Sequence, residues 1–243
     1  MRPDVPNLTG VPSSAQPDVP RLHVLTDVRR GRDPMREVAA ALATGRCAVQ
    51  VRAKEYSDRD VFDLTLRLLE MSAATGSLVL VNDRVDVALA AGADGVHLGV
   101  TDLPVERVRE LMPRGFLVGV TARDVAAARR AEAAGADYLG VGPAYATTTK
   151  EGLPDPLGPE GVAAVAAATD LPVIAVGGVD ASRVPRLLAA GAHGVAVVGA
   201  LSSAEDPAVE AAALAAAVWD RREARAAPPP AVAPKVGATF EHR

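Results

Sequence analysis

The chain has 243 residues, of which 49% are hydrophobic, so it can bury a sizeable core within one domain. Only 3% of the residues are aromatic, so small aliphatic side chains must build the core and Ala-rich segments the helices. The formal net charge of -4 at pH 7 argues against a nucleic-acid-binding surface and favours small molecules as partners.

Proline-rich segments mark both ends of the chain. Residues 1–20 are rich in proline and polar residues, and residues 223–243 contain the run Pro228-Pro229-Pro230. We expect both to be disordered extensions of a single catalytic domain at 21–222. The N-terminal segment lacks the apolar core of a secretion signal, and no apolar stretch is long enough to span a membrane. Because Cys47 has no second cysteine to pair with in the chain, we expect a cytoplasmic protein.

Eight β-rich runs alternate with helical patterns along the middle of the chain. The runs cover residues 22–25, 48–51, 78–81, 96–98, 116–120, 139–141, 172–176 and 195–198. The segment after Asp58 places apolar residues on one helical face, and Asp124 and Ser182 stand where helix N-caps are expected.

A glycine follows the predicted helix before every second strand, at Gly45, Gly92, Gly135 and Gly191. Glycine adopts the left-handed conformation that ends a helix at low cost. This fourfold repeat of paired units indicates an α/β fold of the (β/α)₈ TIM-barrel type in a single domain. A doubly wound open sheet is the alternative.

Polar residues, and a few glycines and small apolar residues, lie at the carboxyl ends of the predicted strands, where the loops of a barrel share one mouth. In strand order they are Gln50, Arg52 and Lys54; Asn82 and Asp83; Asp102; Thr121; Thr147, Thr148, Thr149 and Lys150; Gly177 and Gly178; and Val198, Gly199 and Ala200.

The choice of lysine within this set is selective. The chain carries 26 Lys and Arg residues, and its lysines are Lys54, Lys150 and Lys235. A compact ammonium group suits a phosphate oxygen, and two of these lysines follow strand ends. Asp83 and Asp102 follow neighbouring strands, which predicts that both carboxylates hold one Mg²⁺, with phosphate oxygens filling its remaining positions.

Glycines after the seventh and eighth strands predict a second anion site. Gly178 and Gly199 match the usual phosphate site of barrels, where backbone N–H groups and a short helix hold the anion. Two anion sites in one mouth fit two phosphorylated substrates. Elsewhere, His97 is predicted to be a pocket wall, and Cys47 is rejected as a nucleophile because it precedes its strand.

Five segments carry a resemblance to a known family. They are Gln50-Val51-Arg52-Ala53-Lys54, Val81-Asn82-Asp83-Arg84, Val96-His97-Leu98-Gly99 with Asp102, the run from Gly142 to Lys150, and Ala175-Val176-Gly177-Gly178-Val179. With these segments in this order, the chain resembles the thiamin phosphate synthases. The resemblance implies a transferase of thiamin biosynthesis, which condenses hydroxymethylpyrimidine diphosphate with a thiazole phosphate to give thiamin phosphate and pyrophosphate.

The same resemblance implies a role for each matching residue. Asp83 and Asp102 would hold Mg²⁺, and the catalytic residues Arg52, Lys54, Thr121 and Lys150 would bind the diphosphate together with Asn82. Gln50 would lie beside the pyrimidine, and the thiazole phosphate would contact Thr147, Thr149, Gly178, Val198 and Gly199. Neither a protein nucleophile nor a nucleic-acid or membrane partner is implied, and the sequence leaves a homo-oligomer open.

Two other functions compete with this interpretation. A thiazole tautomerase has the same barrel and isomerises a thiazole carboxylate phosphate, but it should not need the diphosphate and metal residues, and its histidine after the fifth strand is matched here by Arg123. A non-catalytic barrel that binds thiamin precursors as a regulator would be favoured by loss of the metal ligands, which are present. Ala53, Val100, Arg123 and Ala146 depart from the synthase pattern, which leaves an altered substrate preference open.

Overall fold

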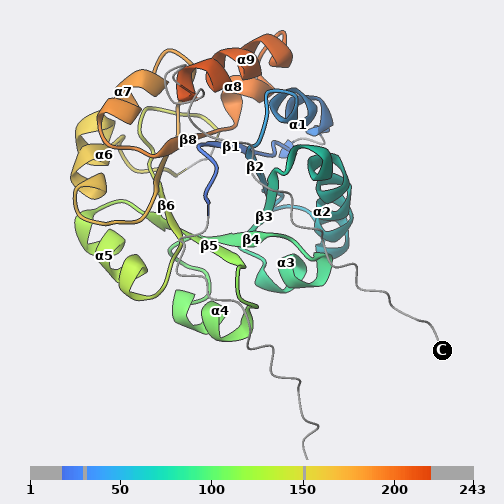
Figure 1. Cartoon of the computed structure of the whole chain (residues 1–243), viewed down its shortest axis with the longest axis horizontal. Helices are drawn as coiled ribbons and strands as arrows, with labels where there is room; N and C mark the ends of the chain where they lie inside the picture. The colour runs from blue at the N-terminus through green and yellow to red at the C-terminus, as the bar shows by residue number, and fades with distance from the viewer. Residues whose placement is uncertain (1–17, 30–31, 150–151, 220–243) are drawn as a thin grey trace, which may run out of the picture.

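The computed structural model describes residues 18–29, 32–149 and 152–219, and shows parallel strands closed into a barrel with helices around it (Figure 1). The strands are β1 (Leu22–Leu25), β2 (Ala48–Val51), β3 (Leu78–Asn82), β4 (Gly95–Leu98), β5 (Leu117–Ala122), β6 (Tyr138–Val141), β7 (Val173–Val176) and β8 (Gly194–Val197). The helices are α1 (Met35–Leu42), α2 (Asp58–Ser72), the 3-10 turn η2 (Ala73–Thr75), α3 (Val85–Ala91), α4 (Val105–Leu111), α5 (Val125–Ala133), α6 (Gly158–Ala166), α7 (Val184–Ala189), α8 (Gly199–Ser202) and α9 (Pro207–Val218).

The strand pairing confirms the predicted closed barrel and excludes the open sheet. Each strand pairs in parallel with its neighbour in the chain, and β1 pairs with β8, with Leu22 opposite Val195. The strands are rich in valine because both of their faces are buried, one inside the barrel and one under the helices. Two strands run further than predicted, so Asn82 lies at the end of β3 and Thr121 inside β5, rather than after them.

Polar side chains fix where several helices begin. Ser57 and Asp60 form a reciprocal capping box at the start of α2, and the Asp124 carboxylate accepts a hydrogen bond from the Ala127 N–H at 2.7 Å, as predicted for an N-cap. The N-cap predicted at Ser182 is wrong. The Ser182 hydroxyl instead donates to Asp180 Oδ1 at 2.6 Å, and α7 starts one residue later, with Arg183 in the N-cap position.

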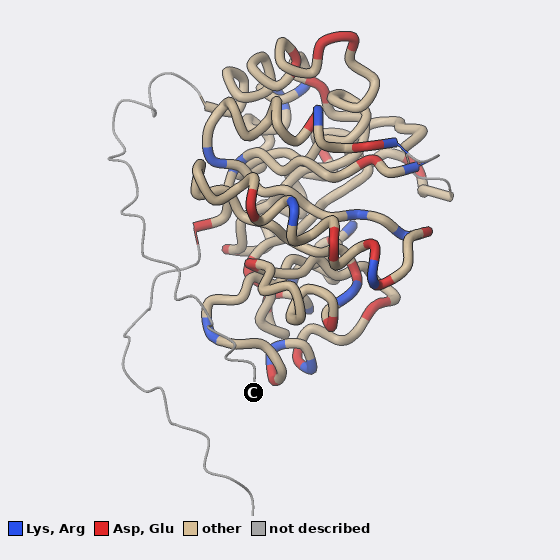
Figure 2. The backbone as a smooth tube through the Cα atoms, turned by 90° about the vertical axis from the view of Figure 1, so that its right-hand side faces the viewer, with Lys and Arg blue, Asp and Glu red and all other residues tan. Residues whose placement is uncertain are grey.

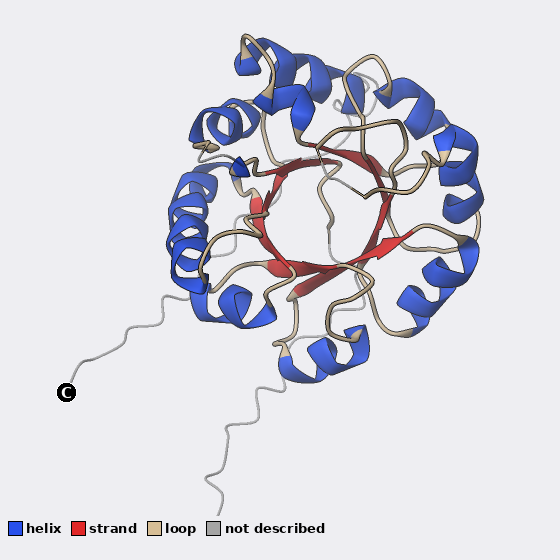
Figure 3. Cartoon of the chain, turned by 180° about the vertical axis from the view of Figure 1, so that it is seen from behind, coloured by secondary structure: helices blue, strands red, loops and turns tan. Residues whose placement is uncertain are grey.

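Two apolar layers hold the barrel together. The larger lies between the strands and the outer ring of helices, which Figure 3 shows from behind. The smaller fills the barrel interior with Val19, Ala48, Leu80, Leu117, Tyr138, Ile174 and Ala196. The barrel is therefore a packed core rather than a pore, as expected for this fold.

The amino-terminal end of the barrel is closed by the first described residues. The Val19 carbonyl lies 2.9 Å from His193 Nε2, and the Pro20 carbonyl lies 2.9 Å from His23 Nε2. Asp18 pairs with Arg46 at 2.9 Å. Residues 18–20 thus belong to the folded barrel, and the rest of the two predicted extensions lies outside the described residues. The opposite end, where the strands finish, forms the mouth.

Charged residues of both signs are interspersed along the backbone on the side that Figure 2 shows. In the part of the chain that the structure describes, no helix is both long and apolar enough to cross a membrane.

A steric prediction follows from the barrel interior. A Cβ atom on Gly119 would overlap the ring of Tyr138, which is buried in the neighbouring strand. We expect Gly119→Ala to lower the free energy of unfolding by about 1–3 kcal/mol, measured by urea denaturation, because the core must shift to admit the methyl group. In a Tyr138→Leu background the same change should cost less than about 1 kcal/mol. An equal cost in both backgrounds would contradict this packing.

Candidate active site

One cavity of about 610 Å³ opens at the carboxyl ends of the strands, a size typical of small-molecule sites. Among its lining residues are all of the predicted substrate-binding residues and two predicted catalytic ones: Gln50, Asn82, Thr147, Thr149, Gly178, Val198, Gly199, Arg52 and Thr121. Lys54 and Asp83 line a smaller adjoining recess, with Asn82 shared between the two spaces. Lys150 lies outside the described residues.

The side of the cavity nearest β2 and β3 presents amide and guanidinium groups. Gln50 is buried, and its Nε2 donates a hydrogen bond to Asn82 Oδ1 at 2.9 Å. This bond engages the Asn82 oxygen and leaves the Asn82 NH₂ group as the donor for an anion. The backbone of Arg52 is held on both sides by Thr26, whose Oγ1 accepts from the Arg52 N–H at 2.8 Å and donates to the Arg52 carbonyl at 3.2 Å. Burial lowers the pKa of the Arg52 guanidinium, and the charge of Asp83 opposes that shift.

The edge formed by the ends of β3 and β4 is acidic. Asp83 has a φ of 66°, a left-handed conformation that is uncommon for residues other than glycine and often found at functional sites. Its N–H donates to the His97 carbonyl at 2.9 Å, which holds the turn. Lys54 Nζ lies 3.3 Å from Asp83 Oδ2. Burial raises the pKa of Asp83, a hydrogen bond to Asp102 and the charge of Asp102 raise it further, and Lys54 lowers it.

Asp102 is tied to the turn after β4, because its Oδ2 accepts a hydrogen bond from the Gly99 N–H at 2.6 Å. The Asp83 and Asp102 carboxyl groups interact with each other, so the two lie close together as predicted. Within the described residues, no group of three or more His, Cys, Asp and Glu side chains could hold a metal. Asp83 and Asp102 are the residues at this edge that could hold a divalent cation, because carboxylate oxygens suit a hard ion such as Mg²⁺.

The opposite side of the cavity is built from the loop after β6 and the ends of β7 and β8. The Thr147 hydroxyl lies 3.2 Å from the Thr149 hydroxyl and accepts from the Thr149 N–H at 3.3 Å. Gly178 has a φ of 63°, and a Cβ there would overlap the Ala146 carbonyl and lie 2.9 Å from Tyr145 Cβ. The close approach of this loop to β7 thus requires glycine at position 178.

A partly buried chain of polar side chains backs the centre of the cavity. His97 Nε2 lies 3.0 Å from Thr121 Oγ1, and His97 Nδ1 lies 3.0 Å from the Tyr138 hydroxyl. A Cβ at Gly140 would lie 2.7 Å from His97 Cε1, so this glycine makes room for the imidazole ring. His97 is therefore a wall of the pocket, as predicted, and it also fixes the Thr121 hydroxyl.

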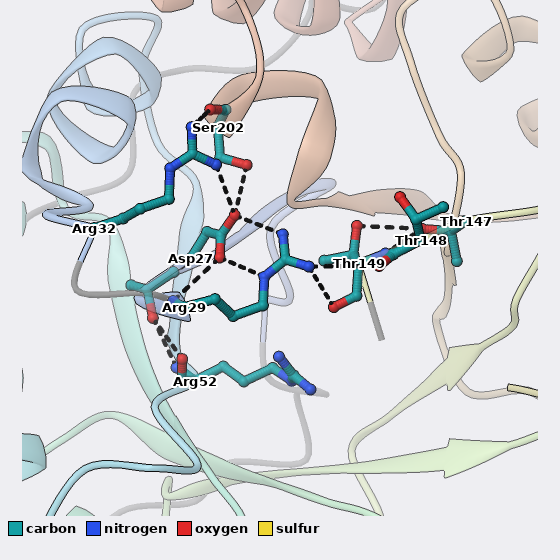
Figure 4. A network of polar contacts seen from close by, with 9 residues as sticks. Asp27, Arg29, Arg32, Arg52, Thr147, Thr148, Thr149 and Ser202 are labelled. Carbon is teal, nitrogen blue, oxygen red and sulfur yellow. Dashed lines mark hydrogen bonds and ion pairs between the residues drawn. The ribbon is translucent and has the colours of Figure 1, made fainter. Parts of the chain in front are cut away.

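Sequence reasoning missed two residues that follow β1. Asp27 is buried, and it forms an ion pair with Arg29, whose guanidinium reaches the loop of Thr147 to Thr149 (Figure 4). Their position after the first strand, equivalent to that of Asp83 after the third, was the signal that could have identified them.

The four departures from the synthase pattern lie in different surroundings. Ala53 is buried, whereas Val100 is 87% exposed. Arg123 Nη2 donates to the Asp155 carbonyl at 2.9 Å, so this arginine fastens β5 to the segment that precedes α6. Ala146 lines the cavity.

Cys47 lies outside the cavity, as the sequence predicted. Its side chain is buried, and burial raises the pKa of the thiol to about 11. We expect iodoacetamide to alkylate the native protein at pH about 8 at least about 100-fold more slowly than a free cysteine, because the thiolate is the reactive form. The rate should increase as the pH approaches the raised pKa, and urea-unfolded protein should react at the rate of free cysteine. Fast alkylation of the native protein would contradict the buried position.

Comparisons with known proteins place this chain in a family. The family described as thiamine monophosphate synthase matches residues 22–201. The chain belongs to this family. A thiamine-phosphate synthase of Salinispora tropica is 53% identical over 203 residues, which cover 82% of this chain and 98% of the relative. One of Chloroflexus aurantiacus is 42% identical over 200 residues, covering 82% and 92%.

Solved structures agree with the family assignment. The thiamine phosphate pyrophosphorylase of Pyrococcus furiosus superposes with a TM-score of 0.74 at 34% identity, covering 82% of this chain and 95% of that one. A 3-hexulose-6-phosphate synthase, at 21% identity and a TM-score of 0.61, shares the barrel fold. Family membership makes the chain a transferase of thiamine biosynthesis, as the sequence motifs predicted.

Proposed function

We propose that the chain joins hydroxymethylpyrimidine diphosphate to a thiazole phosphate, forming thiamin phosphate and pyrophosphate with the help of Mg²⁺. The observation that carries this proposal is that one cavity is lined on one side by Arg52 and Asn82 and on the other by Thr147, Thr149 and Gly178, residues that are suited to binding anions. Two phosphorylated substrates would then meet between them.

The acidic edge supports the role of the metal. The carboxyl groups of Asp83 and Asp102 lie together, and the charge of Asp102 adds to burial in raising the pKa of Asp83, so a cation held by these two residues would relieve their mutual repulsion. Both offer the hard oxygen ligands that Mg²⁺ prefers. Asp83 and Asp102 would hold Mg²⁺, which when bound would stabilise the negative charge on the departing pyrophosphate.

The other predicted catalytic residues, together with Gln50 and Asn82, would act on the pyrimidine substrate. Arg52, Lys54 and Lys150 would pair with diphosphate oxygens, and the Asn82 amide and Thr121 hydroxyl would donate hydrogen bonds to them. Gln50, held by its bond to Asn82, would orient the pyrimidine ring. As the carbon–oxygen bond breaks, the bonding electrons leave with pyrophosphate, and these cations stabilise the charge that develops there.

The thiazole substrate would approach from the other side. Its phosphate would contact the hydroxyl groups of Thr147 and Thr149 and the backbone near Gly178, Val198 and Gly199, which all line the cavity. The thiazole nitrogen would then donate its electron pair to the pyrimidine methylene cation. Because the thiazole nitrogen is the nucleophile, no side chain needs to form a covalent intermediate.

Release of pyrophosphate separates this function from that of a thiazole tautomerase. We expect ³¹P NMR to show pyrophosphate only when both substrates and Mg²⁺ are present, and excess EDTA to stop its release. A tautomerase would isomerise its thiazole substrate without releasing pyrophosphate. A non-catalytic barrel would bind the substrates without turnover.

The single buried cysteine supports a cytoplasmic location for this chemistry.

A further inference from the structure

The Asp27 carboxylate lies just after β1 and is unusually well paired for a buried charge. Its side chain is 2% exposed. Arg29 grips both carboxylate oxygens, with Nε 2.7 Å from Oδ1 and Nη2 2.8 Å from Oδ2. Ser202 Oγ donates to Oδ2 at 2.8 Å, and Arg32 Nη1 lies 3.4 Å from the same atom. A buried carboxylate without such partners would be strongly unfavourable, so these bonds fix its position.

Because Nε and Nη2 of Arg29 both bond to Asp27, the remaining guanidinium nitrogen, Nη1, points at the loop after β6. Arg29 Nη1 donates to the Thr149 carbonyl at 2.9 Å and to the Thr148 carbonyl at 3.4 Å (Figure 4). A planar guanidinium can make both sets of bonds at once because its donors point in fixed directions. Asp27 therefore orients the Arg29 guanidinium, and Arg29 in turn holds the backbone of the threonine loop in place beside the cavity.

The same carboxylate also fastens α8. Ser202 is the last residue of this short helix, and its carbonyl accepts from Arg32 Nη2 at 2.7 Å. At the first residue of the helix, a Cβ on Gly199 would lie 3.3 Å from Thr149 Oγ1, so the threonine loop rests against the start of α8. Asp27 thus joins three segments that are far apart in the sequence and that meet at one side of the cavity.

We propose that Asp27 and Arg29 are a positioning pair that holds the Thr147–Thr149 loop and α8 in the arrangement that receives a monophosphate ester. This inference rests on the proposed function, in which that ester is the thiazole phosphate. Asp27 and Arg29 act through the loop and the helix, whereas Arg52, Asn82 and the acidic edge bind the other substrate.

The test is steady-state kinetics of Arg29→Gln, Arg29→Lys and Asp27→Asn, with Arg107→Gln as control. Arg107 forms an exposed pair with Glu110 on α4. We expect Arg29→Gln to raise KM for thiazole phosphate by about 10- to 100-fold, the usual loss for charge-assisted hydrogen bonds, with KM for the pyrimidine diphosphate within about threefold of wild type. Arg29→Lys should give an intermediate value, because an ammonium cannot grip Asp27 and the loop together.

Calorimetric titration of thiazole phosphate into each protein separates binding from turnover. Circular dichroism and urea unfolding establish that each variant is folded, and Arg29→Gln tests the pair even if the buried Asp27→Asn variant does not fold. An unchanged affinity for thiazole phosphate in Arg29→Gln, or full restoration by lysine, would overturn the positioning role. If the wild type itself forms no product, the proposed function fails instead, so the two failures are distinguishable.

Discussion

Replacing Asp83 with asparagine is expected to lower kcat/KM for the pyrimidine diphosphate by about 10³-fold at a fixed Mg²⁺ concentration. Asparagine keeps the size of the side chain, but it removes the negative charge that pairs with Lys54. The same charge, together with that of Asp102, would bind the cation. Electrostatic stabilisation of a departing anion is among the largest contributions that an enzyme can make. Stopped-time assays of pyrophosphate release over a range of Mg²⁺ concentrations measure the effect.

Asp86→Asn provides the matched control for this substitution. Asp86 lies three residues further along the chain, in the first turn of α3, and its side chain is exposed. The control should retain activity within about twofold of wild type, because an exposed carboxylate away from the mouth contributes little. Equal rates for Asp83→Asn and the control would show that Asp83 does not bind the metal.

Arg52→Gln is expected to lower kcat/KM by about 10²-fold, chiefly through a higher KM for the pyrimidine diphosphate. The Arg52 guanidinium is partly buried in the cavity, where an ion pair with a phosphate is stronger than in water, and burial already lowers its pKa. Initial-rate measurements with each substrate varied in turn would test this, since KM for thiazole phosphate should stay nearly constant. Equal increases in both KM values would show that Arg52 holds the whole cavity rather than one substrate.

Much of the mouth could be predicted because a parallel barrel brings the ends of successive strands together. Asp83 and Asp102 follow β3 and β4, so the topology alone made their carboxyl groups neighbours. The sequence predicted Gly178 as part of a phosphate site from its place after β7, and the structure adds a steric reason for glycine there, the close approach of the Ala146 carbonyl.

Interactions between distant segments could not be predicted in the same way. Asp27 is separated from Ser202 by 175 positions, and Arg29 from Thr149 by 120. Periodicity and strand order say which loops share the mouth, but not which side chain of one loop reaches the backbone of another. The prediction of an N-cap at Ser182 was wrong for a local reason. Asp180 accepts hydrogen bonds from both the Ser182 hydroxyl and the Arg183 N–H, and this turn delays the start of α7.

This chain is expected to form the bond between the two heterocycles. The most direct measurement is mass spectrometry of the reaction of purified protein with hydroxymethylpyrimidine diphosphate, thiazole phosphate and Mg²⁺, comparing wild type with Asp83→Ala and Lys150→Ala. We expect thiamin phosphate from the wild type, little from either variant, and none when one substrate is omitted. Absence of thiamin phosphate from folded wild-type protein with both substrates would contradict this expectation.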